Sequence, residues 1–278
     1  MKRDIFIFRY LSGIIGILVT GVLFVVPFVF ILFTALKSRG QAAFLEFSLP
    51  TEILFFENLI EVIEARDYML ITAFINSTIL TVVSVAALVI LGAMVAFVLQ
   101  RRVTRFNGII NALILAGLMI PPAVVPTIWV MQGLGIFKTL HGLIFIEIAF
   151  GLAFTILLFR AFIASIPKEL DEAAIIDGAG PLRLFFTVIF PLLKSVVATV
   201  IILQSIFVFN DFQNPLYFLP GDENATVQLT LFNFQSQFNT SFNLLYMNIL
   251  IITIPMLILF LLFNKRIVSG MTAGAVKG

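Results

Sequence analysis

The 278-residue sequence contains no cysteine, one histidine and one tryptophan, and only 12% of its residues are charged. Without cysteine, the chain can form neither a disulfide nor a thiolate metal site. The single histidine, His141, has no second metal-ligating side chain at a suitable spacing, so we expect no metal site. With a mean hydropathy of +1.14, the chain has too few charges to cover the surface of a water-soluble domain.

The sequence also lacks a G-x-x-x-x-G-K-[ST] loop, the motif that cradles nucleotide phosphates. The nearest match, GAVKG at 274–278, has the wrong length. We therefore expect this chain to hold no cofactor and to hydrolyse no ATP. Its net charge of +2 reflects the distribution of basic loops and indicates no nucleic-acid partner.

What the sequence does contain is a series of long apolar runs. A hydrocarbon core of roughly 30 Å requires about 20 apolar residues in a helix. Six runs meet this length, which predicts an all-α integral membrane protein, with residues 1–278 forming one transmembrane domain. The predicted spans are about 11–36, 72–99, 107–132, 142–162, 184–210 and 244–263. Prolines between 121 and 126 predict a break in the third span.

The basic residues indicate the orientation, because short cytoplasmic loops hold an excess of Lys and Arg. With the N-terminus inside, thirteen of the 17 Lys and Arg residues are cytoplasmic, which leaves only Lys37, Arg39, Arg66 and Lys138 outside. Both termini are therefore predicted to be cytoplasmic. An amphipathic pattern at 57–69, in the first outer loop, is expected to lie on the membrane face or to receive a substrate-binding protein, and we favour the second.

An acidic segment, ELDEAAIIDGAG (Glu169–Gly180), lies between the fourth and fifth spans. It predicts a cytoplasmic helix within about 167–180, because Pro167 suits a first turn and Gly178 can adopt the left-handed conformation that ends a helix. One interpretation is a solvated connector. The other is a protein docking site, since Ala173 and Ala174 permit close approach while anionic lipid would repel the carboxylates beside them.

The segment EAAIIDGAGPLRLFFTVIFP (172–191) resembles the EAA loop of the membrane subunits of bacterial binding-protein-dependent ABC importers. Five residues match in register, whereas Val188 and Phe190 replace Ile and Leu; the matching residues are Glu172, Ala173, Ala174, Gly178 and Pro191. The ending SGMTAGAVKG (269–278) resembles the C-terminal tail of MalG-type sugar permeases. FNDFQNPLYFL (209–219) and MIPPAVVPTIW (119–129) are also similar to that family.

The resemblance implies a type I ABC importer permease fold in a bacterial or archaeal inner membrane, and import of a carbohydrate, either a di- or an oligosaccharide. It implies a MalF-type second permease subunit, an ATPase homodimer that holds ATP and Mg, and an extracellular or periplasmic sugar-binding protein. The residues that it places at the ATPase are Glu169, Glu172, Ala173, Ala174, Asp177 and Gly178 in the coupling helix, and Thr272, Gly274 and Lys277 in the tail.

Polar side chains within the spans are the candidates for the substrate pathway, because exposing them to lipid is costly. Amides, a carboxylate and aromatic rings suit sugar hydroxyls and C–H faces. The candidates are Asn76, Trp129, Gln132, Asn210, Asp211, Gln213 and Asn214. Alternatively, these residues lie at span ends and meet headgroup water. Glu147, near the start of the fourth span, is expected at the membrane interface.

Three alternatives remain open at this point. A secondary transporter would work without an ATPase, but such proteins usually carry ionisable groups at the interface of internal repeats, and no repeat is evident. An intramembrane enzyme would need a nucleophile and a base, or metal ligands, inside the spans. An ABC permease could also carry a non-sugar solute such as a glycerol phosphate ester.

Overall fold

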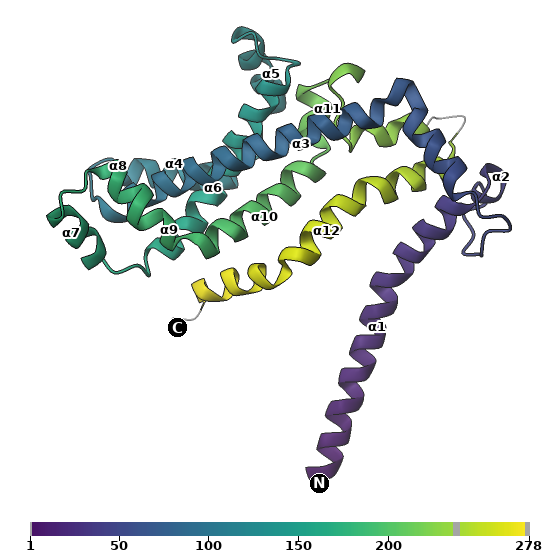
Figure 1. Ribbon diagram of the computed structural model, residues 1–278, viewed down its shortest axis with the longest axis horizontal. Coiled ribbons are helices and arrows are strands. Elements are labelled where there is room, and N and C mark those ends of the chain that lie inside the picture. Colours follow the sequence, from purple (N-terminus) through teal and green to yellow (C-terminus); the bar gives the residue numbers. More distant parts are fainter. Residues whose placement is uncertain (1, 236–239, 276–278) are drawn as a thin grey trace. The chain divides into compact units, whose positions relative to one another are not determined.

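The computed structural model describes residues 2–235 and 240–275, and every regular element among them is helical (Figure 1). The all-α fold class predicted from the sequence is confirmed. The α-helices are α1 (Lys2–Leu36), α2 (Arg39–Ala42), α3 (Phe55–Arg101), α4 (Asn107–Met119), α5 (Val124–Gly133), α6 (Leu140–Ile163), α7 (Glu169–Ile176), α8 (Pro181–Arg183), α9 (Phe190–Leu192), α10 (Lys194–Asn210), α11 (Gln213–Phe218) and α12 (Phe242–Ala275). The others are a π-helix, η1 (Leu184–Ile189), and two 3-10 helices, η2 (Asp222–Asn224) and η3 (Leu229–Phe234).

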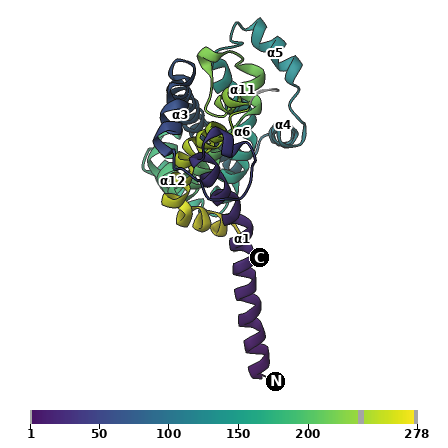
Figure 2. The same cartoon turned by 90° about the vertical axis from the view of Figure 1, so that its right-hand side faces the viewer.

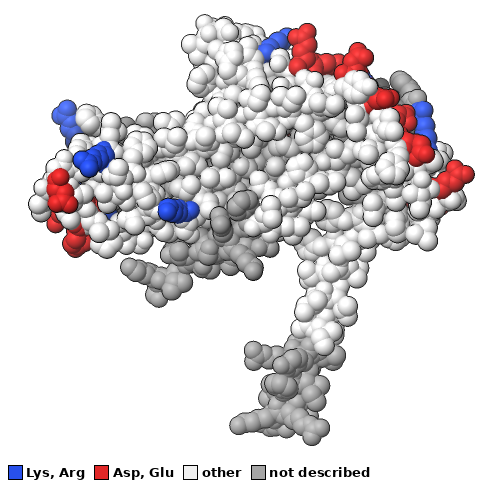
Figure 3. Space-filling view, in the orientation of Figure 1, with Lys and Arg blue, Asp and Glu red and all other residues white. Residues whose placement is uncertain are grey.

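Four of the described helices are long and apolar enough to cross a membrane: Gly13–Leu36 of α1, α3, α6 and Phe242–Leu262 of α12. Two further pairs of helices pass the same test together but are bent, so the number of spans rises to six if each pair is one span. Most of the face seen in Figure 3 is uncharged, as expected of a surface that meets lipid.

The first bent pair is α4 and α5, and the chain bends by 116° between them (Figure 2). Ile120 leaves the helix with extended backbone, at φ −86° and ψ 121°, and two prolines follow it. Proline lacks the N–H that a helix interior uses and disfavours helical backbone in the residue before it. The break expected from the prolines between 121 and 126 is therefore present.

The second bent pair is Pro181–Leu192 and α10, and the chain bends by 79° between them. The sequence predicts one span over 184–210, but in the structure these residues form η1, α9 and α10, with the turn at Leu193. Pro191 has no N–H to donate to the helix, and the wider π-helical turn precedes it. The direction of the chain therefore changes after Pro191.

The chain divides into two compact units, of which the first comprises residues up to Leu70 together with Thr230–Ile254. Several of its buried polar groups are linked by hydrogen bonds. The Asn58 side chain donates to the backbone carbonyls of Ala35 and Lys37 and accepts from Asn243. Lys37, only 1% exposed, donates through Nζ to the carbonyl of Glu46 at 2.7 Å. These bonds satisfy polar groups whose burial would otherwise be costly.

Helix α3 changes unit soon after a non-helical segment, Ala65–Tyr68, where Arg66, Asp67 and Tyr68 have positive φ angles. Positive φ is uncommon for residues with side chains. The segment therefore ends the amphipathic portion predicted at 57–69 and separates it from the apolar portion predicted as the second span.

The second unit, Ile71–Leu229 with Pro255 onward, contains most of the helices. In it α6 packs against α4, α10 and α11. Glycines allow close packing at two points: a Cβ on Gly92 would lie 2.5 Å from Cγ2 of Thr155, and one on Gly151 would lie 2.8 Å from a methyl of Leu88. The side chain of Gln204 donates to the Thr155 hydroxyl at 2.9 Å. This packing joins α3, α6 and α10.

Candidate functional site

Helix α7 presents most of its surface to the outside. Its carboxylates cluster in the first turn, where the positive end of the helix dipole favours anions. Among the predicted coupling residues Glu169, Glu172, Ala173, Asp177 and Gly178 are exposed, whereas Ala174 is half-buried and packs against the core of its own chain. Ala173 is thus the alanine that remains open to a partner.

Two isoleucines of α7 are also exposed, with 59% of Ile175 and 85% of Ile176 accessible, as is 65% of Leu182 just after the helix. Gly178 has φ +80°, which a residue with a Cβ rarely adopts, and it turns the chain after the helix. An apolar surface flanked by charges on a short connecting helix is typical of a protein interaction site.

An ion pair that the sequence did not reveal fixes α7 in place. Arg101, the last residue of α3, approaches Asp171 with Nε 2.7 Å from Oδ2 and Nη2 3.3 Å from Oδ1. Nη2 also donates to the carbonyl of Ile166 at 3.0 Å. The side chains are 9% and 12% exposed, so the pair is largely shielded from water. Because 70 residues separate the partners, no local pattern could have indicated it.

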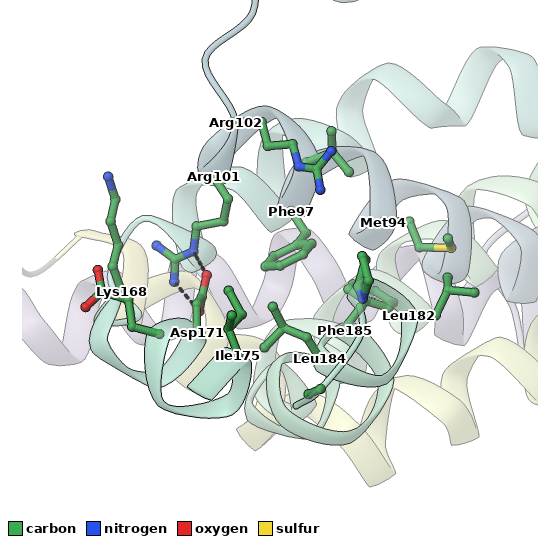
Figure 4. A pocket seen from close by; sticks show the side chains of 14 residues that line it. Met94, Phe97, Arg101, Arg102, Lys168, Asp171, Ile175, Leu182, Leu184 and Phe185 are labelled. Atoms are coloured by element: carbon green, nitrogen blue, oxygen red, sulfur yellow. Dashed lines mark hydrogen bonds and ion pairs between the residues drawn. The ribbon is translucent and has the colours of Figure 1, made fainter. Parts of the chain in front are cut away.

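A cavity of about 610 Å³ adjoins this ion pair, and we call it the basic cavity (Figure 4). Figure 4 shows the Arg101–Asp171 pair between Lys168 on one side and the side chains of Phe97, Leu184 and Phe185 on the other. Its charged lining residues are Arg101, Arg102, Lys168, Asp171 and Glu172. Its other walls are almost entirely apolar.

A second cavity, of about 520 Å³, lies among α6, α10 and α11, and we call it the acidic cavity. Its polar lining comprises Glu147, Gln204, Asn210, Asp211 and Asn214, with the rings of Phe150, Phe154 and Phe207 beside them. Asn214 donates through Nδ2 to Oε1 of Glu147 at 3.2 Å. Asp211 accepts through Oδ1 from the backbone N–H groups of Gln213 and Asn214, while its buried Oδ2 accepts no hydrogen bond from the described residues.

The acidic cavity brings together three of the seven predicted pathway residues, Asn210, Asp211 and Asn214. The other four do not line it. Gln213 contributes only its backbone N–H, and Trp129 and Gln132 are exposed on α5. Asn76 donates to the carbonyl of Ala225 at 3.2 Å, so its side chain holds an outer loop on α3.

Two residues of the acidic cavity were not predicted. Glu147 is 7% exposed and accepts a hydrogen bond from Asn214, and its place at the membrane interface stays a prediction. Gln204 was passed over as part of an apolar run. The sequence did hold a signal for both residues. A carboxylate and an amide within predicted spans are costly to expose to lipid, so such residues are candidates for a functional site.

The predicted C-terminal tail begins inside α12, whose helical backbone continues to Ala275. Thr272 and Gly274 therefore belong to this helix. Lys277 lies outside the described residues. In the part of the chain that the structure describes, no group of three or more histidines or carboxylates could hold a metal ion.

Residues 89–273 match the model of the family described as the binding-protein-dependent transport system inner membrane component. The chain belongs to this family. The match includes α7, both cavities and most of the helices of the second unit, and it makes the chain a multi-pass inner-membrane subunit of a binding-protein-dependent ABC transporter. Within that family the chain is a transport component and not an enzyme.

A curated relative, the melibiose/raffinose/stachyose import permease protein MelC of Bacillus subtilis, is 37% identical over 256 residues, covering 91% of each chain. A solved chain of a bacterial ABC transporter involved in the import of the acidic polysaccharide alginate superposes with a TM-score of 0.81 at 22% identity. That match covers 95% of this chain and 98% of the other. The fold is therefore that of an ABC importer permease, as the resemblance implied.

A second solved structure contains the bacterial alginate transporter in complex with an alginate pentasaccharide-bound periplasmic protein. Its matching chain has a TM-score of 0.68 at 15% identity and covers 95% of this chain and 94% of its own length. This structure shows that the same fold assembles with an external binding protein.

Proposed function

We propose that this permease subunit forms one half of the pathway of an ATP-driven importer for neutral di- or oligosaccharides. Its partners are a MalF-type second permease, two copies of an ATPase that bind ATP and Mg, and an external sugar-binding protein. In this proposal α7 docks on the ATPase and transmits its movements to the membrane helices. The C-terminal tail predicted from the sequence, with Thr272, Gly274 and Lys277, reaches the ATPase dimer.

The exposed apolar tip around α7 supports the coupling role. Ile175, Ile176 and Leu182 are exposed, and so is Ala173 with its small side chain. A separate subunit that covers these residues removes apolar area from water. The Arg101–Asp171 pair holds α7 on the end of α3, so a force applied to α7 is passed to a helix long enough to span the membrane.

The proposed substrate class rests on the residues that line the acidic cavity. Two carboxylates, three amides and three phenylalanine rings line it, and its lining contains no Lys or Arg. Hydroxyl groups can donate to carboxylates, and rings can stack on the C–H faces of a sugar. The buried Oδ2 of Asp211 is an acceptor available to such a hydroxyl. The sugars in the name of MelC are neutral galactosides, which agrees with this chemistry.

Anionic solutes fit the acidic cavity poorly. A uronate such as alginate, or a glycerol phosphate ester, would place its charge beside the Asp211 carboxylate in a cavity whose lining has no Lys or Arg. Like charges repel most strongly where water is scarce. For this reason we propose a neutral substrate, although the alginate transporter shares the fold.

The decisive experiment is reconstitution of the chain in vesicles, alone and with its second permease, ATPase and binding protein. We expect uptake of labelled melibiose or raffinose only in the complete complex and only with ATP. Uptake driven by an ion gradient with the chain alone would establish the secondary-transport alternative and overturn the proposal. Preferential uptake of alginate oligosaccharides would overturn the neutral substrate while leaving ATP-driven transport intact.

A single substitution tests the coupling site. Glu172→Lys should release the ATPase or uncouple ATP hydrolysis from uptake, while the protein still inserts in the membrane. Glu223→Lys, on the exposed outer segment η2, is the matched control and should transport normally. Full transport by the Glu172→Lys variant would contradict docking through α7.

A further inference from the structure

The loop that follows α1 and α2 contains a short segment, Phe44–Leu49, whose large apolar side chains are exposed. Phe44 is 74%, Phe47 58% and Leu49 70% exposed. Given the reach of an extended chain, the Cα atoms of Phe44 and Leu49 lie at most about 11 and 7 Å from that of Phe47. The three side chains therefore belong to one small apolar patch, and patches of this kind mark contact with a membrane or with another protein.

The ring of Phe47 packs against the last turns of α1. Its centroid lies 6.3 Å from that of Phe30, with an angle of 13° between the two rings, and 5.9 Å from that of Phe33. Phe30 comes six residues before the end of α1, which corresponds to about 9 Å along the helix axis. After it leaves α1, the chain therefore turns back along the side of this helix.

The level of Phe30 corresponds to the outer edge of the hydrocarbon core. With the N-terminus in the cytoplasm, as the distribution of Lys and Arg predicts, the uncharged run of α1 enters the membrane after Arg9. About 20 helical residues cross the hydrocarbon core, so the core ends near Phe30. Because Phe47 stacks on Phe30, it lies at the boundary between the acyl chains and the headgroups of the outer leaflet.

Carbonyl groups of the Phe44–Leu49 segment find their hydrogen-bond donors within the protein. Nζ of Lys37, a residue that is 1% exposed, donates to the carbonyl oxygen of Glu46 at 2.7 Å. Nε2 of Gln41 in α2 donates to the carbonyl oxygen of Leu49 at 3.0 Å. Backbone polar groups near hydrocarbon need such internal partners, because water is scarce there. The segment thus combines internally bonded carbonyl groups with exposed apolar side chains.

We propose that the Phe44–Leu49 segment inserts into the outer leaflet of the membrane, with Phe47 at the edge of the hydrocarbon core and Lys37 holding the segment against α1. The apolar side chains then contact phospholipid. A second permease subunit would bring its own hydrogen-bond donors, whereas the internal donors Lys37 and Gln41 match surroundings that supply none. Glu46 is exposed within the segment, and its carboxylate limits the depth of insertion to the headgroup boundary.

The absence of cysteine allows a fluorescent probe to be attached to this chain at one chosen residue. Phe44→Cys, Phe47→Cys and Leu49→Cys are each labelled with bimane on the full-length chain, which is measured in vesicles both alone and assembled with its partner subunits. Brominated phospholipid quenches a probe in the leaflet, and iodide quenches a probe in water. We expect brominated lipid to remove most of the fluorescence at all three positions, and bromines near the headgroup to quench more than bromines at the end of the acyl chain.

The matched control is Glu223→Cys on the exposed outer segment η2, where iodide should quench the probe and brominated lipid should not. Iodide quenching at Phe47→Cys equal to that at Glu223→Cys would overturn the proposal. So would quenching by brominated lipid that is present in the chain alone and lost in the complex, because this result identifies a partner subunit as the occupant of the patch.

A second variant, Lys37→Met, tests how the segment is held. It leaves the carbonyl of Glu46 without its donor, so quenching of the residue-47 probe by brominated lipid should fall and quenching by iodide should rise. Lys138→Met, at an exposed lysine whose Nζ lies 5.8 Å from the ring centroid of Phe137, is the control and should change neither. Unchanged quenching in Lys37→Met would overturn the role of Lys37. The measurements use neither ATP nor sugar, so their failure is distinct from failure of the proposed transport function.

Discussion

Both cavities of the second unit are lined by carboxyl groups, but the neighbours that stabilise these groups differ. In the basic cavity a buried carboxylate, Asp171, is compensated by Arg101 at 2.7 Å. In the acidic cavity Glu147 and Asp211 share a lining with no Lys or Arg, and their described donors are an amide and backbone N–H groups. A compensated charge fixes two helices to each other, whereas uncompensated acceptors can still bind a ligand. The first arrangement suits force transmission and the second suits passage of a solute.

The largest expected effect comes from breaking the ion pair of the basic cavity. Arg101→Ala leaves Asp171 as a buried, uncompensated charge, which costs about 3–5 kcal/mol. We expect α7 to lose its fixed position, so that sugar uptake by the complete complex falls more than tenfold while ATP hydrolysis falls much less. Uptake and hydrolysis measured on the same vesicles give the ratio.

Two companion variants separate charge from geometry. Arg101→Lys keeps the charge but loses the two-point contact, and it should retain part of the coupling. The double variant Arg101→Met/Asp171→Leu removes both charges and should regain the stability that Arg101→Ala loses. Unchanged coupling in Arg101→Ala would show that the pair does not transmit force.

The next effect concerns the packing beside the acidic cavity. Gly92→Ala places a methyl 2.5 Å from Cγ2 of Thr155, whose hydroxyl accepts from Gln204 in the cavity lining. Overpacking of this kind costs about 1–3 kcal/mol. The midpoint of thermal unfolding should fall, and Thr155→Ser, which removes the obstructing methyl, should restore it. Gly117→Ala, with its nearest contact at 3.4 Å, should have little effect.

A smaller effect is expected at the turn after α7. Gly178 has φ +80°, and a left-handed conformation costs residues with a Cβ about 1–2 kcal/mol. Gly178→Ala should therefore reduce ATP-coupled uptake severalfold by altering the end of the coupling helix. Gly180→Ala is the control, since Gly180 has φ −70° and open space around it. Equal loss in both variants would mean that glycine content, and not the left-handed turn, matters.

The smallest effect distinguishes the substrate classes of the acidic cavity. Asp211→Asn exchanges charge-assisted hydrogen bonds for neutral ones, a difference of about 1 kcal/mol, so uptake of a neutral oligosaccharide should fall about fivefold. Uptake of a uronate oligosaccharide relative to the neutral one should rise, because the repulsion is removed. Competition assays with both sugars measure this ratio, and Glu223→Gln should leave it unchanged.

How much the sequence could predict depends on how far apart in the sequence the residues that determine each feature lie. Apolar runs and prolines are local, so the helices and the break after Ile120 could be predicted from them. The turn at Leu193 was missed because the apolar run from Leu184 to Asn210 hides a π-helix and a change of direction. Arg101 and Asp171, or Glu147 and Asn214, are 70 and 67 residues apart, and only the tertiary structure brings these partners together.

The open turn between α4 and α5 has a consequence for where this part of the chain can lie. From Ile120 to Ala123 the backbone is exposed on the isolated subunit, and extended carbonyl groups cannot be left bare in hydrocarbon. Either water or a neighbouring polypeptide must solvate them. The corner between α4 and α5 is therefore expected either outside the hydrocarbon core or against another polypeptide of the assembled transporter.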